Sequence, residues 1–271
     1  MESHPINQHY VPRVLLKNFS SKKSHVWVYD KQSKKKEWSF IKERPISKVA
    51  SEEYFYDKIP NIKEGSYEYE LGKLEREIEP IISKIIESKD ISILTEKERE
   101  RFSLFIALQH LRTKSGLNKL KRITGDLEDK INHFFAESNN FDYRGLWFEM
   151  METAPKFSKY ISNKIWFLGE SEKLFYCSDH PVVLQNSSVQ DSLRGTLGLD
   201  SYGIEIYMPI SDSLILCMFC EKLLQFTEKK TPLLDYHNRD YLLNANSLQI
   251  QQSERFIFSS SNNFEMVEEC M

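Results

Sequence analysis

The feature that most constrains the fold is the order of its segments, because strand-like segments at both ends enclose a helical middle. Segments rich in β-branched and aromatic residues predict strands at 25–30, 37–41, 53–56, 164–168, 174–177, 204–208, 214–219 and 255–258. Apolar spacing and polar boundaries predict helices at 13–19, 67–86, 96–122, 127–138, 144–160 and 233–253. Hairpin-length connections between successive strands favour antiparallel pairing. The order therefore predicts an α+β fold, with a mostly antiparallel sheet of amino- and carboxy-terminal strands packed against a central block of long helices.

The helical block has the clearest local signals. Over residues 67–86 isoleucine and leucine recur at helical spacing, and Pro80 is expected to kink this helix. Thr95 and Glu98 have the spacing of a capping box, which predicts that the next helix begins there and runs over 96–122.

No low-complexity linker borders the helical block. We therefore expect one α+β domain over residues 1–271, within which residues 66–160 could form an inserted helical subdomain. A chain of this length can bury a sizeable core.

Composition and charge narrow the class of protein. The net charge is −3 and the pI about 6.2, which argues against a strongly basic, non-specific nucleic-acid binder. No run of about 18 apolar residues and no secretory signal is visible, so we expect a cytoplasmic protein that does not span a membrane. The C-x-x-C pair Cys217 and Cys220 lies in an apolar run, which favours a buried, reduced strand over a zinc site.

Two polar residues lie on the apolar face of the predicted helix 96–122. At about 100° per residue, Gln109 and Arg112 fall in the same sector as Phe102 and Phe105. A buried arginine is costly unless it is paired. An anion should therefore meet Arg112, and it is either a carboxylate of the fold or a phosphate or carboxylate of a ligand.

A second group of polar residues follows the predicted strand 174–177 directly, in the sequence Ser178-Asp179-His180-Pro181. Polar groups at the end of a strand can project into a cleft while the sheet holds them rigidly. Asp179 could orient an imidazole, accept a proton or ligate a metal. The alternative is an ordinary turn, because serine and aspartate before proline commonly bond to their own backbone.

The third group is the opening segment Asn7-Gln8-His9-Tyr10-Val11-Pro12. Pro12 holds the residue before it away from helical geometry, so we expect a stiff, extended arm. His9 is a candidate general acid or base, because histidine titrates near neutral pH. A structural role for this lone histidine is the alternative. The arm is expected to bring His9 close to Arg112 and Asp179.

These segments together resemble the bacterial family of unknown function DUF4238. The similarity extends in order along the chain through the opening hexapeptide, 105–113, Ser178-Asp179-x-Pro181-Val182, 208–211, 246–249 and 255–259. His180 departs from the resemblance, which leads us to expect a small polar residue there. The resemblance implies a bacterial protein of mixed α and β structure, and it implies no activity and no catalytic residues.

Our first functional hypothesis is an enzyme that hydrolyses phosphate esters in nucleic acid or nucleotides, such as a nuclease-like effector of antiviral defence or toxin type. His9 would act as general acid or base, Asp179 would orient it, and Arg112 would neutralise charge on the phosphoryl group. Three amide side chains would position the substrate, namely Asn7, Gln8 and Gln109. The chain carries no Walker loop, G-x-G-x-x-G or G-x-S-x-G motif that would indicate another chemistry.

The alternatives differ in class. One is a non-catalytic sensor or interaction module in which Arg112 holds an anionic ligand or a partner encoded in the same operon. Another is a buried polar network that only fixes the amino-terminal arm to the helix and sheet. The cofactor stays open: a divalent metal held by His9, Asp179 and His180 is an alternative, although their spacing matches no diagnostic metal motif.

Overall fold

The computed structural model describes residues 6–20, 22, 24–33, 40–57, 66–135, 142–187, 197–221 and 233–271. The helices are α1 (Arg13–Leu16), α2 (Tyr67–Ser88), α3 (Glu96–Leu111), α4 (Lys114–Phe135), α5 (Tyr143–Glu152), α6 (Ala154–Ser162), α8 (Arg239–Gln252) and α9 (Glu265–Cys270). The strands are β1 (Asn7–His9), β2 (His25–Asp30), β3 (Ile41–Pro45), β4 (Ser51–Glu53), β5 (Ile165–Glu170), β6 (Cys177–Ser178), β7 (Val183–Gln185), β8 (Glu205–Pro209), β9 (Leu214–Phe219), β10 (Leu233–Asp235) and β11 (Phe256–Ser259). The predicted α+β class is confirmed.

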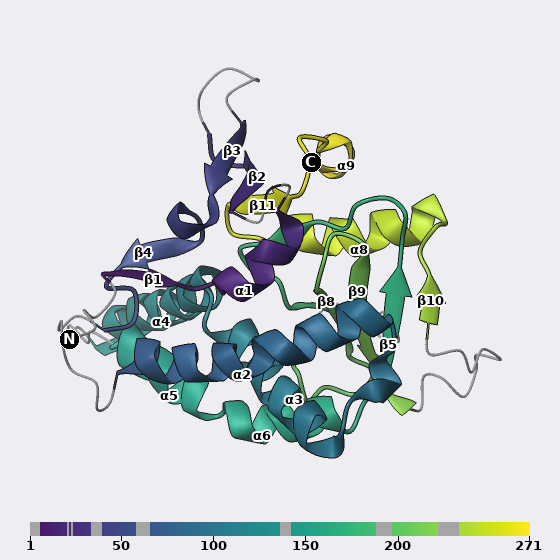
Figure 1. The fold of residues 1–271 in the computed structure, drawn as a ribbon. Coiled ribbons are helices and arrows are strands. Elements are labelled where there is room, and N and C mark those ends of the chain that lie inside the picture. The colour runs from purple at the N-terminus through teal and green to yellow at the C-terminus, as the bar shows by residue number, and fades with distance from the viewer. Residues whose placement is uncertain are drawn as a thin grey trace.

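The described strands form three sheets. Strands β1 and β4 make a two-stranded antiparallel sheet, while a four-stranded sheet has the order β3-β2-β11-β6 and so joins both ends of the chain. The third sheet has the order β10-β5-β9-β8-β7 and is antiparallel except for the pair β10 and β5. In Figure 1 the four-stranded sheet lies above the helices α2, α3, α5 and α6.

Alternating side chains along the strands bury both faces of the two larger sheets. In β5, Trp166 and Leu168 face the main core formed with the helical block, whereas Phe167 faces the other side. That other side is covered by α8, which contributes Leu242 and Leu248. This period-two pattern is the expected geometry of a strand between two apolar layers.

The start of α3 agrees with the prediction and its end does not. Thr95 and Glu98 form the capping box. The single helix predicted over 96–122 is wrong, because the helix is interrupted at residues 112–113, where α3 ends and α4 has not yet begun. Thr113 accepts a hydrogen bond from the backbone N–H of Gly116 at 3.3 Å, in the manner of an N-terminal cap for α4.

The helix predicted over 233–253 is also wrong. Residues 233–235 form β10, which pairs in parallel with β5, and the helix begins only after Asn238 caps the backbone N–H of Asp240. The helix predicted over 144–160 is divided into α5 and α6 at Thr153, where a proline stands at the start of α6. Proline favours this first turn and disrupts a helix interior.

Four further boundaries need correction. The strand predicted over 53–56 is instead β4, which ends before Tyr54 adopts a left-handed backbone with φ of 53°. The strand predicted over 174–177 is confirmed only at Cys177, because β6 is Cys177–Ser178, and it pairs with β11, not with β5. The return strand predicted over 37–41 overlaps the observed strand β3 only at Ile41, where β3 begins. Residues 34–39 lie outside the described part. The helix predicted over 127–138 is the end of α4, with residues 136–138 also outside it. No helix in the described part is both long and apolar enough to cross a bilayer.

Candidate functional site

The buried amide of Gln8 fixes the amino-terminal arm. Its Oε1 accepts hydrogen bonds from the backbone N–H groups of Tyr56 at 2.6 Å and Asp57 at 3.1 Å. Both N–H groups belong to the segment that follows β4, so one side chain secures the pairing of β1 with β4. Asn7, next to it, is exposed. Of these two predicted substrate-binding residues, Gln8 is therefore occupied by the backbone and Asn7 faces solvent.

The end of α3 carries a second buried connection to the arm. Gln109 donates through Nε2 to the carbonyl of Tyr10 at 2.9 Å and accepts through Oε1 from Arg112 Nε at 2.8 Å. Arg112 is only 1% exposed and also donates to Glu75 of α2 at 2.7 Å. Burial alone would lower the pKa of Arg112, but attraction to Glu75 and its neighbours outweighs burial and raises it. The anion that meets Arg112 is thus a carboxylate of the fold.

His9 lies beside this connection in an uncharged state. Its Nε2 is 3.4 Å from the carbonyl of Ile46, and burial lowers its pKa to about 4. The hydroxyl of Tyr56 donates a hydrogen bond that is shared by two carbonyl groups, that of His9 at 3.4 Å and that of Arg112 at 3.3 Å. The backbones of His9 and Arg112 are therefore brought together.

Asp179 is held by the turn between α8 and β11. Its Oδ1 accepts from the backbone N–H of Glu254 at 2.8 Å, and its Oδ2 accepts from those of Arg255 at 2.7 Å and Phe256 at 2.9 Å. Burial raises the pKa of Asp179 to about 6, although these three bonds oppose the shift. A carboxylate has about four acceptor positions, so three amides leave one position open.

Asp179 and Tyr10 line the same polar cavity of about 340 Å³. Burial, followed by the negative charges of Asp179 and Glu52, raises the pKa of Tyr10. The remaining lining residues come from separate parts of the chain: Val28, Gln32, Arg44, Lys48, Val49, Ala50, Ser51, Glu52, Lys114, Asn118, Glu254, Arg255 and Phe256. Of the site residues predicted from the sequence, only Asp179 belongs to this lining. His9, Arg112, Gln109, Gln8 and Asn7 do not.

Charged side chains surround the mouth of the cavity. Lys114 pairs with Glu52, and Arg255 binds Asp30 through two hydrogen bonds of 2.7 Å. Arg44 and Lys48 are exposed and form no ion pair with any residue in the described ranges. The mouth therefore presents two cations that no carboxylate of the described structure contacts, although the charge of Arg44 also acts on Asp30.

A pair of histidines lies next to the break between α3 and α4. The rings of His110 and His180 have centroids 5.0 Å apart, and Thr113 Oγ1 lies 2.7 Å from His180 Nδ1. Burial lowers the pKa of both histidines, that of His110 to about 4. The described residues contain no group of three or more His, Cys, Asp or Glu side chains placed to hold a metal.

Three amide side chains on α8 fix the segment that carries Asp179, and the sequence predictions did not include them. Asn246 accepts from the N–H of Tyr176 at 2.8 Å and donates to the carbonyl of Leu174 at 3.1 Å. Gln249 accepts from Ser178 Oγ at 2.7 Å and donates to Pro181 at 2.9 Å, and Gln252 binds both backbone groups of Leu184. Their three-residue spacing, which places them on one side of a helix, was the available signal.

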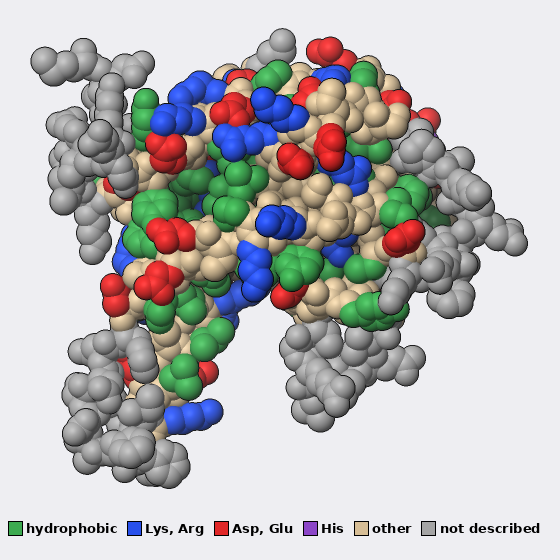
Figure 2. All heavy atoms as spheres, turned by 90° about the horizontal axis from the view of Figure 1, so that it is seen from below, with side chains coloured by type: hydrophobic (Ala, Val, Ile, Leu, Met, Phe, Trp, Pro, Cys, Tyr) green, Lys and Arg blue, Asp and Glu red, His purple; other side chains and the backbone are tan. Residues whose placement is uncertain are grey.

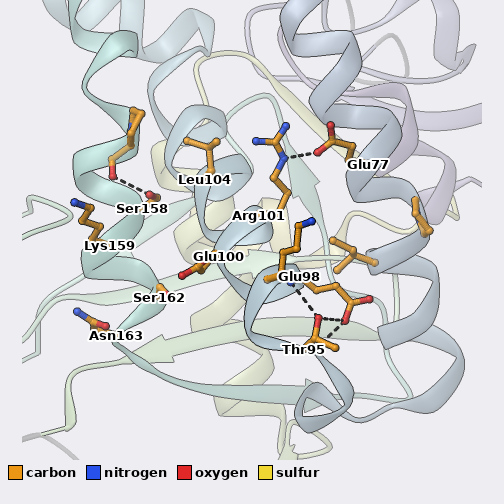
Figure 3. Close-up of a pocket in the computed structure, with 14 residues that line it drawn as sticks. Glu77, Thr95, Glu98, Glu100, Arg101, Leu104, Ser158, Lys159, Ser162 and Asn163 are labelled. Carbon is orange, nitrogen blue, oxygen red and sulfur yellow. Dashed lines mark hydrogen bonds and ion pairs between the residues drawn. The ribbon is translucent and has the colours of Figure 1, made fainter.

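A larger groove of about 1180 Å³ lies between α2, α3 and α6. The groove lies on the side of the molecule formed by the helical block. On the face seen in Figure 2, acidic and basic side chains are interspersed. Figure 3 shows two of the contacts within its lining: Arg101 pairs with Glu77, and Thr95 bonds to Glu98. None of the site residues predicted from the sequence lines the groove, so it is the weaker candidate.

The fold and the site define an α+β protein in which an amino-terminal arm and a carboxy-terminal turn enclose a small polar cavity. A family model described as "Protein of unknown function (DUF4238)" matches residues 7–263, so the chain belongs to this family, as the sequence resemblance predicted. No curated protein and no solved structure matches the chain. The family description assigns no activity, so function has to be inferred from the cavity.

Proposed function

We propose that the protein binds a small anionic ligand, bearing a phosphate or carboxylate group, in the cavity beside Tyr10 and Asp179. The observation that carries the proposal is the mouth of the cavity, where Arg44 and Lys48 have no ion-pair partner among the described residues. Lys114 and Arg255 add two more cations to the lining, each already paired with one carboxylate, Glu52 and Asp30 respectively. An anion that enters would meet several charge-assisted donors at once.

The size of the cavity supports a small ligand. At about 340 Å³ it lies at the lower end of ligand pockets, which span roughly 300–1,000 Å³. A single small molecule or one terminal nucleotide fits such a volume, whereas a nucleic-acid duplex does not.

The binding proposal is tested by calorimetric titration of the purified protein with phosphate, pyrophosphate and a sugar phosphate. We expect binding that weakens with added salt, because the mouth is solvent-exposed. Arg44→Ala and Lys48→Ala should each weaken it. Lys42→Ala is the matched control, because Lys42 is an exposed cation on the same strand as Arg44 and does not line the cavity. Absence of binding to all three ligands would overturn the proposal.

A second candidate function is hydrolysis of a phosphate ester in the same cavity, and the elevated pKa of Asp179, about 6, favours it. With one acceptor position open, Asp179 would take a proton from water as the water oxygen bonds to phosphorus. The bond from phosphorus to the leaving oxygen would break, and Tyr10 would protonate that oxygen. Lys114 and Arg255 would neutralise the developing charge. These are the roles that the sequence hypothesis gave to His9 and Arg112.

The hydrolase proposal requires turnover. Nucleotides, short RNA and single-stranded DNA would be incubated with the protein in Mg²⁺, in Mn²⁺ and in chelator. We expect Asp179→Asn and Tyr10→Phe to abolish product formation, while Tyr10→Phe retains ligand binding. If the unmodified protein forms no product in any condition, the hydrolase proposal is wrong and the binding proposal is unaffected.

A further inference from the structure

We infer that the ligand of the cavity is a nucleoside monophosphate, bound with its phosphate at the mouth and its base at the floor. This inference rests on the proposed binding function and names the chemical class of its ligand. It places the phosphate away from Asp179 and is therefore an alternative to the hydrolase proposal. It follows from the unequal distribution of charge, exposure and aromatic surface within the lining.

The mouth and the floor of the cavity differ in chemistry. Arg44, Lys48 and Arg255 are exposed and carry positive charge. Tyr10, Val28, Val49 and Ala50 are buried, each no more than 5% exposed, and provide an apolar and aromatic surface. A ligand that fills the cavity should therefore carry its negative charge at one end and an apolar, planar group at the other.

The inner carboxylates exclude a second anionic group. Asp179 and Glu254 belong to the same wall, and Glu254 accepts a hydrogen bond from Asn118 at 3.0 Å. A phosphate pushed to this depth would be repelled by like charges in a poorly solvated place. Neutral N–H or O–H donors would instead be attracted, since a carboxylate accepts hydrogen bonds from the exocyclic amines of bases.

Aromatic residues favour a base over a bare sugar. Tyr10 and Phe256 both line the cavity, and the guanidinium of Arg255 lies 4.7 Å from the centroid of the Phe256 ring. Bases stack well on such surfaces, and a base on an aromatic ring contributes about 1–3 kcal/mol of binding. The small volume limits the ligand to a single nucleotide.

The test compares the affinities of AMP, GMP, CMP and UMP with those of ribose 5-phosphate and inorganic phosphate, by calorimetry on the full chain. We expect at least one nucleoside monophosphate to bind about fivefold or more tightly than ribose 5-phosphate, the ratio that one stacked base provides. Equal affinity for ribose 5-phosphate and every nucleotide would overturn the inference and leave the binding proposal standing. Absence of binding by all of these phosphates would overturn both.

Two variants locate the two ends of the ligand. Arg44→Ala should weaken the binding of the nucleotide and of ribose 5-phosphate alike, because both present a phosphate to the mouth. Glu254→Gln should weaken only the binding of the nucleotide. The control is Glu53→Gln, which should change neither affinity, because Glu53 is an exposed residue of β4 outside the lining. Thermal unfolding of each variant confirms that it is folded. A Glu254→Gln protein that is folded and loses no selectivity for nucleotides would contradict the orientation.

Discussion

The buried pair of Arg112 and Glu75 provides the sharpest prediction about this fold. Replacing Arg112 with methionine removes two hydrogen bonds, to Glu75 at 2.7 Å and to Gln109 at 2.8 Å, and keeps an apolar chain in the space. Breaking a buried ion pair costs about 3–5 kcal/mol. The Glu75 side chain is 24% exposed and can regain water, so we expect a loss near the lower end, about 3 kcal/mol.

The assay is urea unfolding, supported by thermal unfolding. At about 2–4 °C per kcal/mol for a chain near this length, Arg112→Met should lower the Tm by about 6–12 °C. The double variant Glu75→Leu with Arg112→Met should regain most of the loss, because apolar pairs often replace buried ion pairs well. Arg101→Met is the control, since its pair with Glu77 is exposed and worth about 1 kcal/mol or less.

Two results would refute this reasoning. One is a loss below about 1 kcal/mol for Arg112→Met, which would mean that the guanidinium's contacts with Glu75 and Gln109 contribute little to the stability of the folded protein. The other is a double variant whose loss equals the sum of the two single losses, because interacting residues should not be additive. Ligand affinity per folded molecule should be unchanged in Arg112→Met, since Arg112 does not line the cavity.

Three further predictions concern other contacts. Thr95→Ala removes the capping box of α3 and should cost about 1 kcal/mol in urea unfolding, while Thr95→Ser should cost much less. Gln249→Leu leaves Ser178 Oγ and the Pro181 carbonyl without their partner, and should cost about 2–3 kcal/mol by the same assay. Burial lowers the pKa of His110 from 6.5 to about 4, so the unfolded chain binds its proton first and stability is lost as the pH falls through this range. His110→Asn should flatten that dependence in unfolding measured from pH 7 to pH 4, and an unchanged slope would contradict the assignment.

Local signals predicted the elements that depend on nearby residues. The capping box at Thr95 and the hairpin of β8 and β9 were both placed correctly, because a helix cap and a short turn are specified within a few residues. The hairpin-length connection between the predicted strands 164–168 and 174–177 favoured their pairing, whereas β6 pairs with β11 about eighty positions later in the chain. A short apolar run predicts that a strand forms, but it does not indicate which other strand it pairs with.

The site shows the same division. Helical periodicity correctly placed Gln109 and Arg112 on a buried face, but their partners Glu75 and Tyr10 depend on how α2 and the amino-terminal arm pack against α3. Asp179 was identified from its place at a strand end. The cations of the cavity mouth were not, because Arg44 and Lys114 are ordinary surface residues until distant segments meet.

The origin of the cavity walls has a consequence for the newly made chain. Its lining joins Tyr10 and residues 28–52 to residues 254–256, so one side is translated well before the other. Domains fold as units, and contacts between distant segments form slowly. A nascent chain that stops before residue 254 lacks both β11 and the backbone amides that bind Asp179. Ligand binding at this site would therefore report that residues 254–256 have been made and folded, and chains terminated before them would be unable to bind.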